Sequence, residues 1–297
     1  MAQVGTLDFK GFVEGRREQR AGGSQGGGHD YVYASDHAMR IAFEKMKPIE
    51  LAVSAAVRFF KSAGKAELLG HGVKVGPRQF PKVHELATEC AQTLGIPTPT
   101  VYIMNSAVVN AYTYGTNDDS FITIHSALVD RFTTEELRTV MGHECGHIHN
   151  NHVVYLTTMY YLTTMASIFV KWIFEPARLA LNSWSRRAEV TCDRAGMLCS
   201  RSLDVSSAVF AKLALGSSKL ISEMNMDEFL AQHEESRESV GRYRELFASH
   251  PWLPKRVLAL RTFAESELYK RHVGVEGAGL SMEDVDSRVH EIIKVIG

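Results

Sequence analysis

The sequence predicts an α+β fold that is predominantly α-helical and carries one small antiparallel or mixed sheet. Segments rich in β-formers occur only at about residues 98–126, separated by turn residues. Helical periodicity covers residues 31–69 and 81–94, and beyond residue 127 the pattern is almost wholly helical. With 297 residues, 45% of them apolar, the chain can bury one large core or two modest domains.

Three parts are expected along the chain. The glycine-rich run at residues 22–28 cannot pack, so residues 1–30 are expected to form a flexible tail rather than a pro-segment or an interaction arm. Residues 31–80 are expected as an N-terminal helical segment. Residues 81–297 are expected as a single catalytic domain, whose sheet occupies about residues 98–126.

A helix at about residues 134–155 follows the sheet. Thr133 and Glu136 have the spacing of a capping box, which marks its start. Gly142 and Gly146 are poor helix formers, each costing about 1 kcal/mol relative to alanine. Two such residues indicate either the close approach of another backbone or substrate, or tight packing between helices.

The pentad His-Glu-Cys-Gly-His at residues 143–147 lies on this helix and is the pattern of zinc peptidases. His143 and His147 are four residues apart, so both imidazoles can reach one metal ion. Glu144 lies beside that ion, where its carboxylate can take a proton from a water that the metal activates. The pentad indicates a metallohydrolase.

The third ligand of such a site has two usual sources. In the metzincin pattern a third histidine follows six residues after the second, but that position holds Val153. The other source is a glutamate on a second helix, and Glu189 is the best candidate. Asp193 lies four residues later on the same face and could accept the free ring N–H of a ligand histidine. A solvated, charged helix face is the alternative for these acids, and Glu175, the only nearer acid, has no partner acid four residues on.

Four motifs, in this order, resemble the family that includes HtpX and the CAAX prenyl endopeptidases. They are residues 110–115, residues 137–147, the segment from Ser185 to Asp193, and the run at residues 249–251 with Arg256. The resemblance spans roughly residues 80–262 and is specific, because four separate motifs agree. Its departures at Gly142, Cys145 and Cys192 touch no ligand.

The family consists of gluzincin metalloendopeptidases with a zincin-like catalytic domain. The resemblance implies that His143, His147 and Glu189 bind one zinc ion per chain and that Glu144 is the general base. It also implies that Asp193 orients a ligand histidine. Cys145 and Cys192 are expected to pack as small apolar side chains, with a redox link between them only weakly supported.

A polypeptide substrate is expected to bind as an added strand. Peptidases of this kind commonly hold substrate along a sheet edge through backbone hydrogen bonds. In the resembling family the edge strand carries the run at residues 110–115, which places substrate against Asn110, Ala111, Tyr112 and Thr113. An ordinary β-meander is the alternative.

His250 and Arg256 are the remaining catalytic candidates. The oxyanion of amide hydrolysis commonly needs a second donor besides the metal, and both side chains could supply one. The alternatives are that His250 caps a loop at Pro251 and that Arg256 binds a carboxylate structurally. His250 could also fill the open metal position when substrate is absent, which would keep the enzyme latent.

The sequence predicts a cytoplasmic protein. Its start lacks the basic and apolar regions of a signal peptide, and four cysteines without paired spacing do not suggest a disulfide framework. A net charge near −1 gives no case for nucleic acid. Residues 153–170 carry no charge, which reaches the lower limit for a membrane span.

For residues 153–174 we favour a buried or interface helix that continues the pentad helix, ahead of a dimer contact or a peripheral membrane face. The acidic stretch at residues 224–245 is expected as a lid or loop. The sequence as a whole therefore predicts a zinc metalloendopeptidase with a protein or peptide substrate. A chaperone-like binder of unfolded or membrane-associated chains, with secondary proteolysis, is the alternative.

Overall fold

The computed structural model describes residues 30–60, 66, 70–165, 175–217, 219–238, 245 and 248–295. The predicted tail at residues 1–30 lies outside the described residues except for its last residue. Residues 166–174 of the uncharged stretch and residues 239–244 of the acidic stretch also lie outside them.

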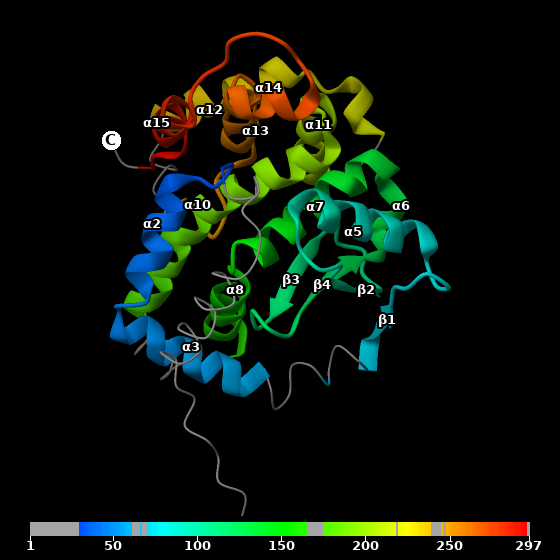
Figure 1. Ribbon diagram of the computed structural model, residues 1–297, viewed down its shortest axis with the longest axis vertical. Helices are drawn as coiled ribbons and strands as arrows, with labels where there is room; N and C mark the ends of the chain where they lie inside the picture. The colour runs from blue at the N-terminus through cyan, green and yellow to red at the C-terminus, as the bar shows by residue number, and fades with distance from the viewer. Residues whose placement is uncertain are drawn as a thin grey trace, which may run out of the picture.

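The predicted α+β fold, mostly helical with a small sheet, is confirmed (Figure 1). The strands are β1 (Gly72–Lys74), β2 (Thr100–Met104), β3 (Ala111–Gly115) and β4 (Ser120–His125). The first helices are α2 (Ala34–Phe43), α3 (Lys47–Phe59), α5 (Pro81–Leu94), α6 (Ser126–Arg131), α7 (Thr134–His149) and α8 (Val153–Tyr160), which the π-helical turn Tyr161–Met165 extends. The others are α10 (Glu175–Ser200), α11 (Leu203–Leu215), the short 3-10 helix Leu220–Glu223, α12 (Met226–Glu238), α13 (Leu253–Ala264), α14 (Glu267–Val273) and α15 (Met282–Ile293).

The sheet is mixed, with strand order β1-β2-β4-β3. β2 and β4 are parallel, whereas β1 pairs with β2 and β3 pairs with β4 in antiparallel fashion. β3 is therefore an edge strand of the described sheet. Helix was expected throughout residues 31–80, so strand β1 was not predicted. Three residues are too few to show the alternation of a strand, and their pairing with Tyr102 to Met104 is a tertiary contact.

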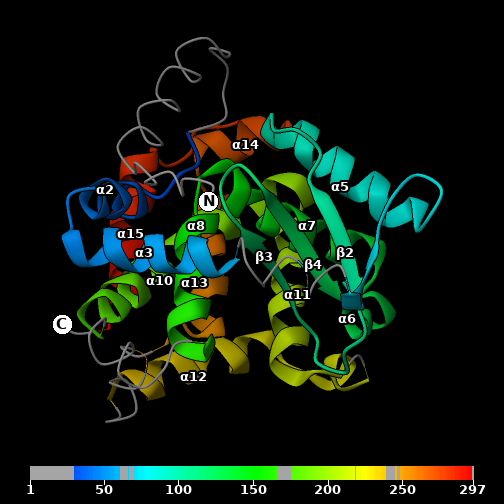
Figure 2. The ribbon, with the colours of Figure 1, turned by 90° about the horizontal axis from the view of Figure 1, so that it is seen from below.

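Helix α7 is central to the fold. It packs against α5, α10, α11 and the edge strand β3. Its predicted capping box is present: the Thr133 hydroxyl accepts from the Glu136 N–H, and the Glu136 carboxylate accepts from the Thr133 N–H. The two views together show α2 and α3 beside α8 and α10, the sheet on the other side of α8, and α11–α15 gathered at the end opposite α3 (Figures 1 and 2).

The glycines of α7 allow this helix to contact α10 closely. A Cβ atom on Gly142 would lie 2.7 Å from the Cys199 Cβ, and one on Gly146 would lie 2.8 Å from the Ala195 Cβ. On α10, a Cβ atom on Gly196 would lie 2.6 Å from the Thr139 carbonyl oxygen. The nearest atoms include the Gly196 and Cys192 Cα atoms, so the close approach of another backbone and tight packing between helices are the same contact here.

The pentad helix ends earlier than predicted. α7 stops at His149, Asn151 adopts a left-handed conformation with φ 58°, and α8 starts at Val153. The expected helix to about residue 155, and its continuation into the uncharged stretch, are therefore wrong. Asparagine tolerates the left-handed region better than most residues, which is why the chain can turn here.

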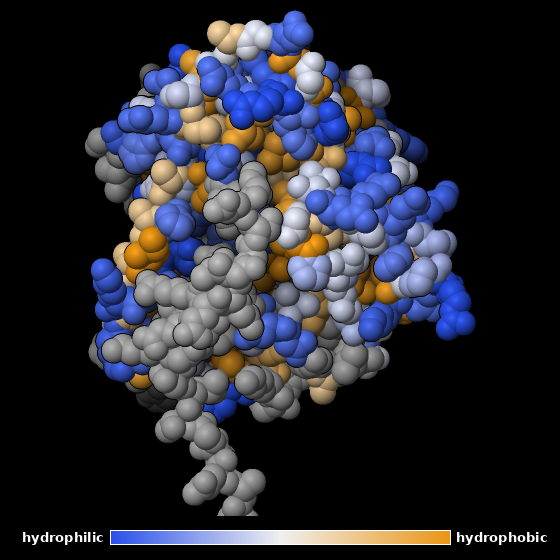
Figure 3. Space-filling view, in the orientation of Figure 1, coloured by the Kyte–Doolittle hydropathy of each residue, from blue (hydrophilic) through white to orange (hydrophobic). Residues whose placement is uncertain are grey.

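The described part of the uncharged stretch is mostly buried. Val154, Tyr155 and Met159 of α8 pack with Phe43 and Trp184 in a core of their own, separate from the larger core under the sheet. Among the described helices none combines the length and apolar character that crossing a membrane requires. The face in Figure 3 shows mainly hydrophilic residues over the C-terminal helices and α5, with hydrophobic ones between them.

Part of the acidic stretch is also helical. Residues 226–238 form α12, which packs against α13, so the expectation of a loop is wrong for these residues. All four cysteines are buried and free, and Cys145 packs in the larger core.

Candidate active site

Three predicted ligand residues converge on one point. The Nε2 atoms of His143 and His147 lie 3.2 Å apart, and each lies 3.6 Å from a carboxylate oxygen of Glu189. Ligands about 2.0–2.2 Å from a tetrahedral metal ion lie roughly 3.3–3.6 Å from one another. The two imidazoles on α7 and the carboxylate on α10 therefore have the spacing of a metal site.

The pKa shifts of Glu189 and His147 suit a metal. Burial raises the pKa of Glu189, but His250 and Arg256 are the first of several positive groups that together hold it well below its usual value. Burial lowers the pKa of His147, which keeps the imidazole neutral and able to coordinate. An anionic oxygen and two imidazole nitrogens form a donor set that suits a metal such as zinc.

Asp193 and Arg256 support the ligands from behind. The His143 Nδ1 atom lies 2.9 Å from an Asp193 carboxylate oxygen, so a proton on Nδ1 leaves Nε2 free for the metal. Arg256 donates to both Asp193 oxygens, at 2.8 and 2.5 Å, and lies 2.9 Å from a Glu189 oxygen. Its guanidinium is buried over the Phe210 ring. Of the two roles considered for Arg256, oxyanion donor and structural partner of a carboxylate, these contacts are those of the structural partner.

Glu144 faces the edge strand. Its carboxylate accepts a hydrogen bond of 2.6 Å from the Thr113 hydroxyl, which also lies 3.3 Å from the Glu144 carbonyl oxygen. The side chain is buried, beside the two histidines on the same helix. Thr113, predicted as a substrate contact, thus also orients the predicted base.

The backbone N–H and C=O groups of every second residue of β3 point away from the sheet, on the side of the strand that lines the cleft. The His125 N–H donates to the Asn110 carbonyl and the Thr116 N–H donates to the Asp119 carbonyl, so even-numbered residues pair with β4. Ala111, Thr113 and Gly115 must therefore point their N–H and C=O groups away from β4. At Gly115 the Thr157 hydroxyl already accepts from the N–H and donates to the C=O.

A cleft of about 630 Å³ joins these groups. It is lined by β3 with Asn110, by the pentad on α7 and by His250. The His250 Nδ1 atom lies 3.0 Å from a Glu189 oxygen, while 58% of its side chain is exposed. Every predicted site residue lines this cleft, so the structure brings together residues from 110 to 256.

Two further residues adjoin the site and were not predicted. His152 follows the pentad by five residues, one short of the position that the metzincin pattern requires, and its ring contacts His147. Asp36 contacts His152 from α2. A histidine so near the pentad is a signal that sequence could have offered, but nothing in sequence marks Asp36.

The fold and the site together define a zincin-like metallohydrolase, with two helix-borne histidines, a glutamate from a second helix and an edge strand beside them. Residues 77–264 match the sequence pattern of Peptidase family M48. The chain therefore belongs to this peptidase family, and the predicted resemblance to HtpX is confirmed.

Relatives carry names that agree with this assignment. The chain is 36% identical over 170 residues, 56% of its length and 49% of the relative's, to "Plastoglobule-localized metallopeptidase 48, chloroplastic" of Arabidopsis thaliana. It is 31% identical over 126 residues, 42% of each protein, to "Protease HtpX homolog" of Moorella thermoacetica. It is 26% identical over 197 residues, 58% of its length and 68% of the relative's, to "Protease HtpX" of Actinobacillus pleuropneumoniae. The chain spans about half the length of the first two. No solved structure matches it.

Proposed function

We propose that the protein is a zinc-dependent metalloendopeptidase that hydrolyses peptide bonds in proteins or peptides. The single observation that carries the proposal is the position of Glu144, whose buried carboxylate accepts a hydrogen bond from Thr113 of the edge strand β3 in the cleft that His143 and His147 also line. A base, a metal site and a polypeptide-binding edge in one cleft are the parts that amide hydrolysis requires.

The chain's own residues account for the steps. Zinc held by His143, His147 and Glu189 would polarise the peptide carbonyl and lower the pKa of a water to about 7. Glu144 takes the proton of that water during attack and delivers it to the leaving amine nitrogen. His250, whose side chain is largely exposed in the cleft, donates to the carbonyl oxygen as negative charge develops there.

Substrate would lie as a strand antiparallel or parallel to β3, using the outward N–H and C=O groups of Ala111 and Thr113. The pairing would stop at Gly115, because the Thr157 hydroxyl occupies both of its outward backbone groups. Backbone pairing is indifferent to side-chain identity, which suits an endopeptidase that accepts varied sequences.

The substitution Glu144→Gln tests the mechanism. It keeps the shape of the side chain and removes the base, so zinc content should stay at one ion per chain while cleavage of casein falls by roughly 10²–10⁴-fold. Glu135→Gln, at an exposed position in the first turn of the same helix, is the matched control and should retain activity. Full activity in Glu144→Gln would contradict the proposal.

Latency is a finer proposal for the same site. The His250 ring already contacts Glu189 at 3.0 Å, so a small movement would bring it to the fourth metal position and exclude water. The variant His250→Ala loses the restraint and the oxyanion donor together, so a substrate for which the restraint is the larger effect should be cleaved faster than by the wild type. If the variant lost activity on every substrate and gained it on none, the restraint role would lose its support.

The same variants distinguish the peptidase from the alternative predicted from sequence, a chaperone-like binder. A wild-type protein that retains unfolded casein without cutting it, with Glu144→Gln indistinguishable from it, would favour the binder. A cytoplasmic location, the absence of a nucleic-acid partner and a membrane or dimer contact through residues 153–174 stay predictions.

A further inference from the structure

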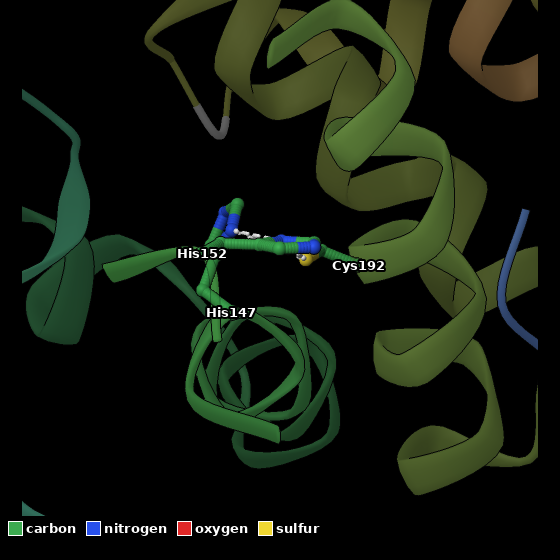
Figure 4. Close-up of side chains that lie close together, drawn as sticks. All are labelled: His147, His152 and Cys192. Carbon is green, nitrogen blue, oxygen red and sulfur yellow. Dashed lines mark hydrogen bonds between the residues drawn. The ribbon is translucent and has the colours of Figure 1, made fainter. Parts of the chain in front are cut away.

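A second cluster of side chains lies directly behind His147. The His147 Nδ1 atom, on the far side of the ring from the predicted metal, lies 3.2 Å from the His152 Nδ1 atom and 3.2 Å from the Cys192 sulfur. Figure 4 shows the three side chains pointing toward one another from α7, the turn after it, and α10. All three are buried.

The cluster ends on a carboxylate. The His152 Nε2 atom lies 3.1 Å from an Asp36 oxygen, and both residues are 1% exposed. Asp36 also accepts hydrogen bonds from the Trp184 indole N–H at 2.8 Å and the Thr191 hydroxyl at 2.7 Å. Burial raises the pKa of Asp36, but His152 and the hydrogen bonds from Thr191 and Trp184 lower it below its usual value.

These contacts place the ring protons for a neutral His152 ring. An ionised carboxylate only accepts, so the His152 Nε2 then carries the proton and its Nδ1 is an acceptor. The His147 Nδ1 then carries the proton between the two rings, because two facing Nδ1 atoms 3.2 Å apart hold only one. The His147 Nε2 is left with its lone pair directed at His143 and Glu189, as metal coordination requires.

We infer that Asp36 and His152 are positioning residues for the metal site, acting on His147 through this chain of hydrogen bonds. The inference rests on the proposed metal-binding role of His147 and extends that site to a residue of α2. Asp36 lies 41 residues before the start of the family match at residue 77. The matched region alone therefore lacks the carboxylate that accepts from His152, and the N-terminal helical segment supplies it.

The local fold holds the chain in place. The left-handed Asn151 turns the backbone so that the His152 N–H donates to the His147 carbonyl at 3.0 Å, which returns His152 to the ring it contacts. α2 is held independently of this contact, since the Arg194 guanidinium and the Ala34 N–H both bind Asp286 on α15. The chain of hydrogen bonds from Asp36 through His152 to His147, called the relay below, is therefore built from α2, α7 and the turn after α7.

A metal ion between His147, His152 and Cys192 is the competing occupant, because the three ligand atoms are 3.2–3.6 Å apart. A single proton between the His147 and His152 Nδ1 atoms accounts for their close approach. A metal ion there would instead require the His147 ring to lose the protons from both of its nitrogen atoms. Metal stoichiometry separates the two occupants: the relay requires one zinc ion per chain, and a second tightly bound ion would overturn it.

The test measures zinc affinity by competition with a chromogenic chelator. His152→Leu removes the acceptor for His147 and should weaken zinc binding about 10–100-fold, the usual effect of removing such a support. His152→Asn places an amide oxygen near the position of Nδ1 and should restore most of the affinity. In Asp36→Asn an amide N–H can donate to His152, which would move the proton of each histidine ring to its other nitrogen atom. This variant should weaken zinc binding to a similar extent as His152→Leu.

Leu181→Ala is the matched control. Leu181 is fully buried in the same small core as Trp184 but touches none of the relay residues by hydrogen bond, so this variant should lose stability and keep its zinc affinity. Nitrogen NMR of the histidine rings in the zinc-loaded protein should show a protonated Nδ1 on His147 in the wild type.

The outcomes are distinguishable. Unchanged zinc affinity in His152→Leu, or equal losses in His152→Asn and His152→Leu, would overturn the relay and leave the proposed function standing. A folded wild-type chain that binds no zinc would instead overturn the proposed function itself.

Discussion

Replacing Gly196 by alanine would test whether the close contact of α7 and α10 sets the metal site. A Cβ atom at this position would lie 2.6 Å from the Thr139 carbonyl oxygen, about 0.8 Å short of the 3.4 Å at which ordinary contact begins. Because the obstacle is a helix backbone and not a flexible side chain, the two helices must move apart.

Two opposing free energies set the stability change. Alanine improves helix propensity by about 1 kcal/mol over glycine, whereas overpacking a tight contact costs about 1–3 kcal/mol. The variant is therefore expected to be about 0–2 kcal/mol less stable than the wild type. The effect on metal binding should be larger, because a displacement near 0.8 Å exceeds the roughly 0.2 Å tolerance of a metal–ligand distance.

Urea unfolding of the metal-free protein and chelator competition for zinc give the two quantities. Gly70→Ala is the matched control, because a Cβ atom on Gly70, also in helical conformation, meets nothing within 4 Å. That control should be as stable as the wild type or slightly more so, with the same zinc affinity. A Gly196→Ala protein with wild-type zinc affinity would refute the idea that helix contact sets the ligand geometry.

Three further results are expected. Thr113→Val removes the hydroxyl that holds Glu144, so turnover of casein should fall about tenfold with zinc content unchanged; an unchanged rate would show that the hydrogen bond does not orient the base. Lys212→Met leaves the buried Glu136 carboxylate without its cation, 2.7 Å away, and should lower the free energy of unfolding by about 3 kcal/mol; a loss below 1 kcal/mol in urea titration would contradict this. Asp36 has a lowered folded-state pKa, so its contribution is complete above its unfolded value near 3.8 and is lost as the pH falls through the lower folded value. The metal-free Asp36→Asn protein should therefore lose less stability than the wild type between pH 4 and the acid limit, as measured by thermal unfolding, and an identical acid dependence would count against the assignment.

The local features of the chain could be read from sequence because each depends on neighbours along one helix or strand. The capping box at Thr133 and Glu136, the three strands between residues 100 and 125, and helix α5 all follow from local pattern. One of the failures also has a local cause. A single left-handed residue, Asn151, ended the pentad helix, and the pattern of apolar residues around it gave no warning.

For the polar residues of the site, the sequence offered candidate roles and left an alternative open for each. Sequence favoured Glu189 and Asp193 as partners of the pentad, with a solvated charged face as the alternative, and the packing of α10 on α7 shows these acids buried beside the histidines. Arg256 illustrates the same point: its residue type allowed either an oxyanion donor or a structural cation. Only its position between the two carboxylates showed which contacts it makes.

By itself, the sequence determined that two histidines and a base share one helix face, because an α-helix repeats every 3.6 residues whatever surrounds it. It also determined the class of protein, since four motifs in order are specific. Tertiary structure alone decided that Arg256 lies between the two carboxylates, that Thr113 of the edge strand binds Glu144, and that Asp36 on α2 lies behind His152. Those are contacts between segments far apart in the chain, and their geometry depends on the packing of whole helices, which no local pattern encodes.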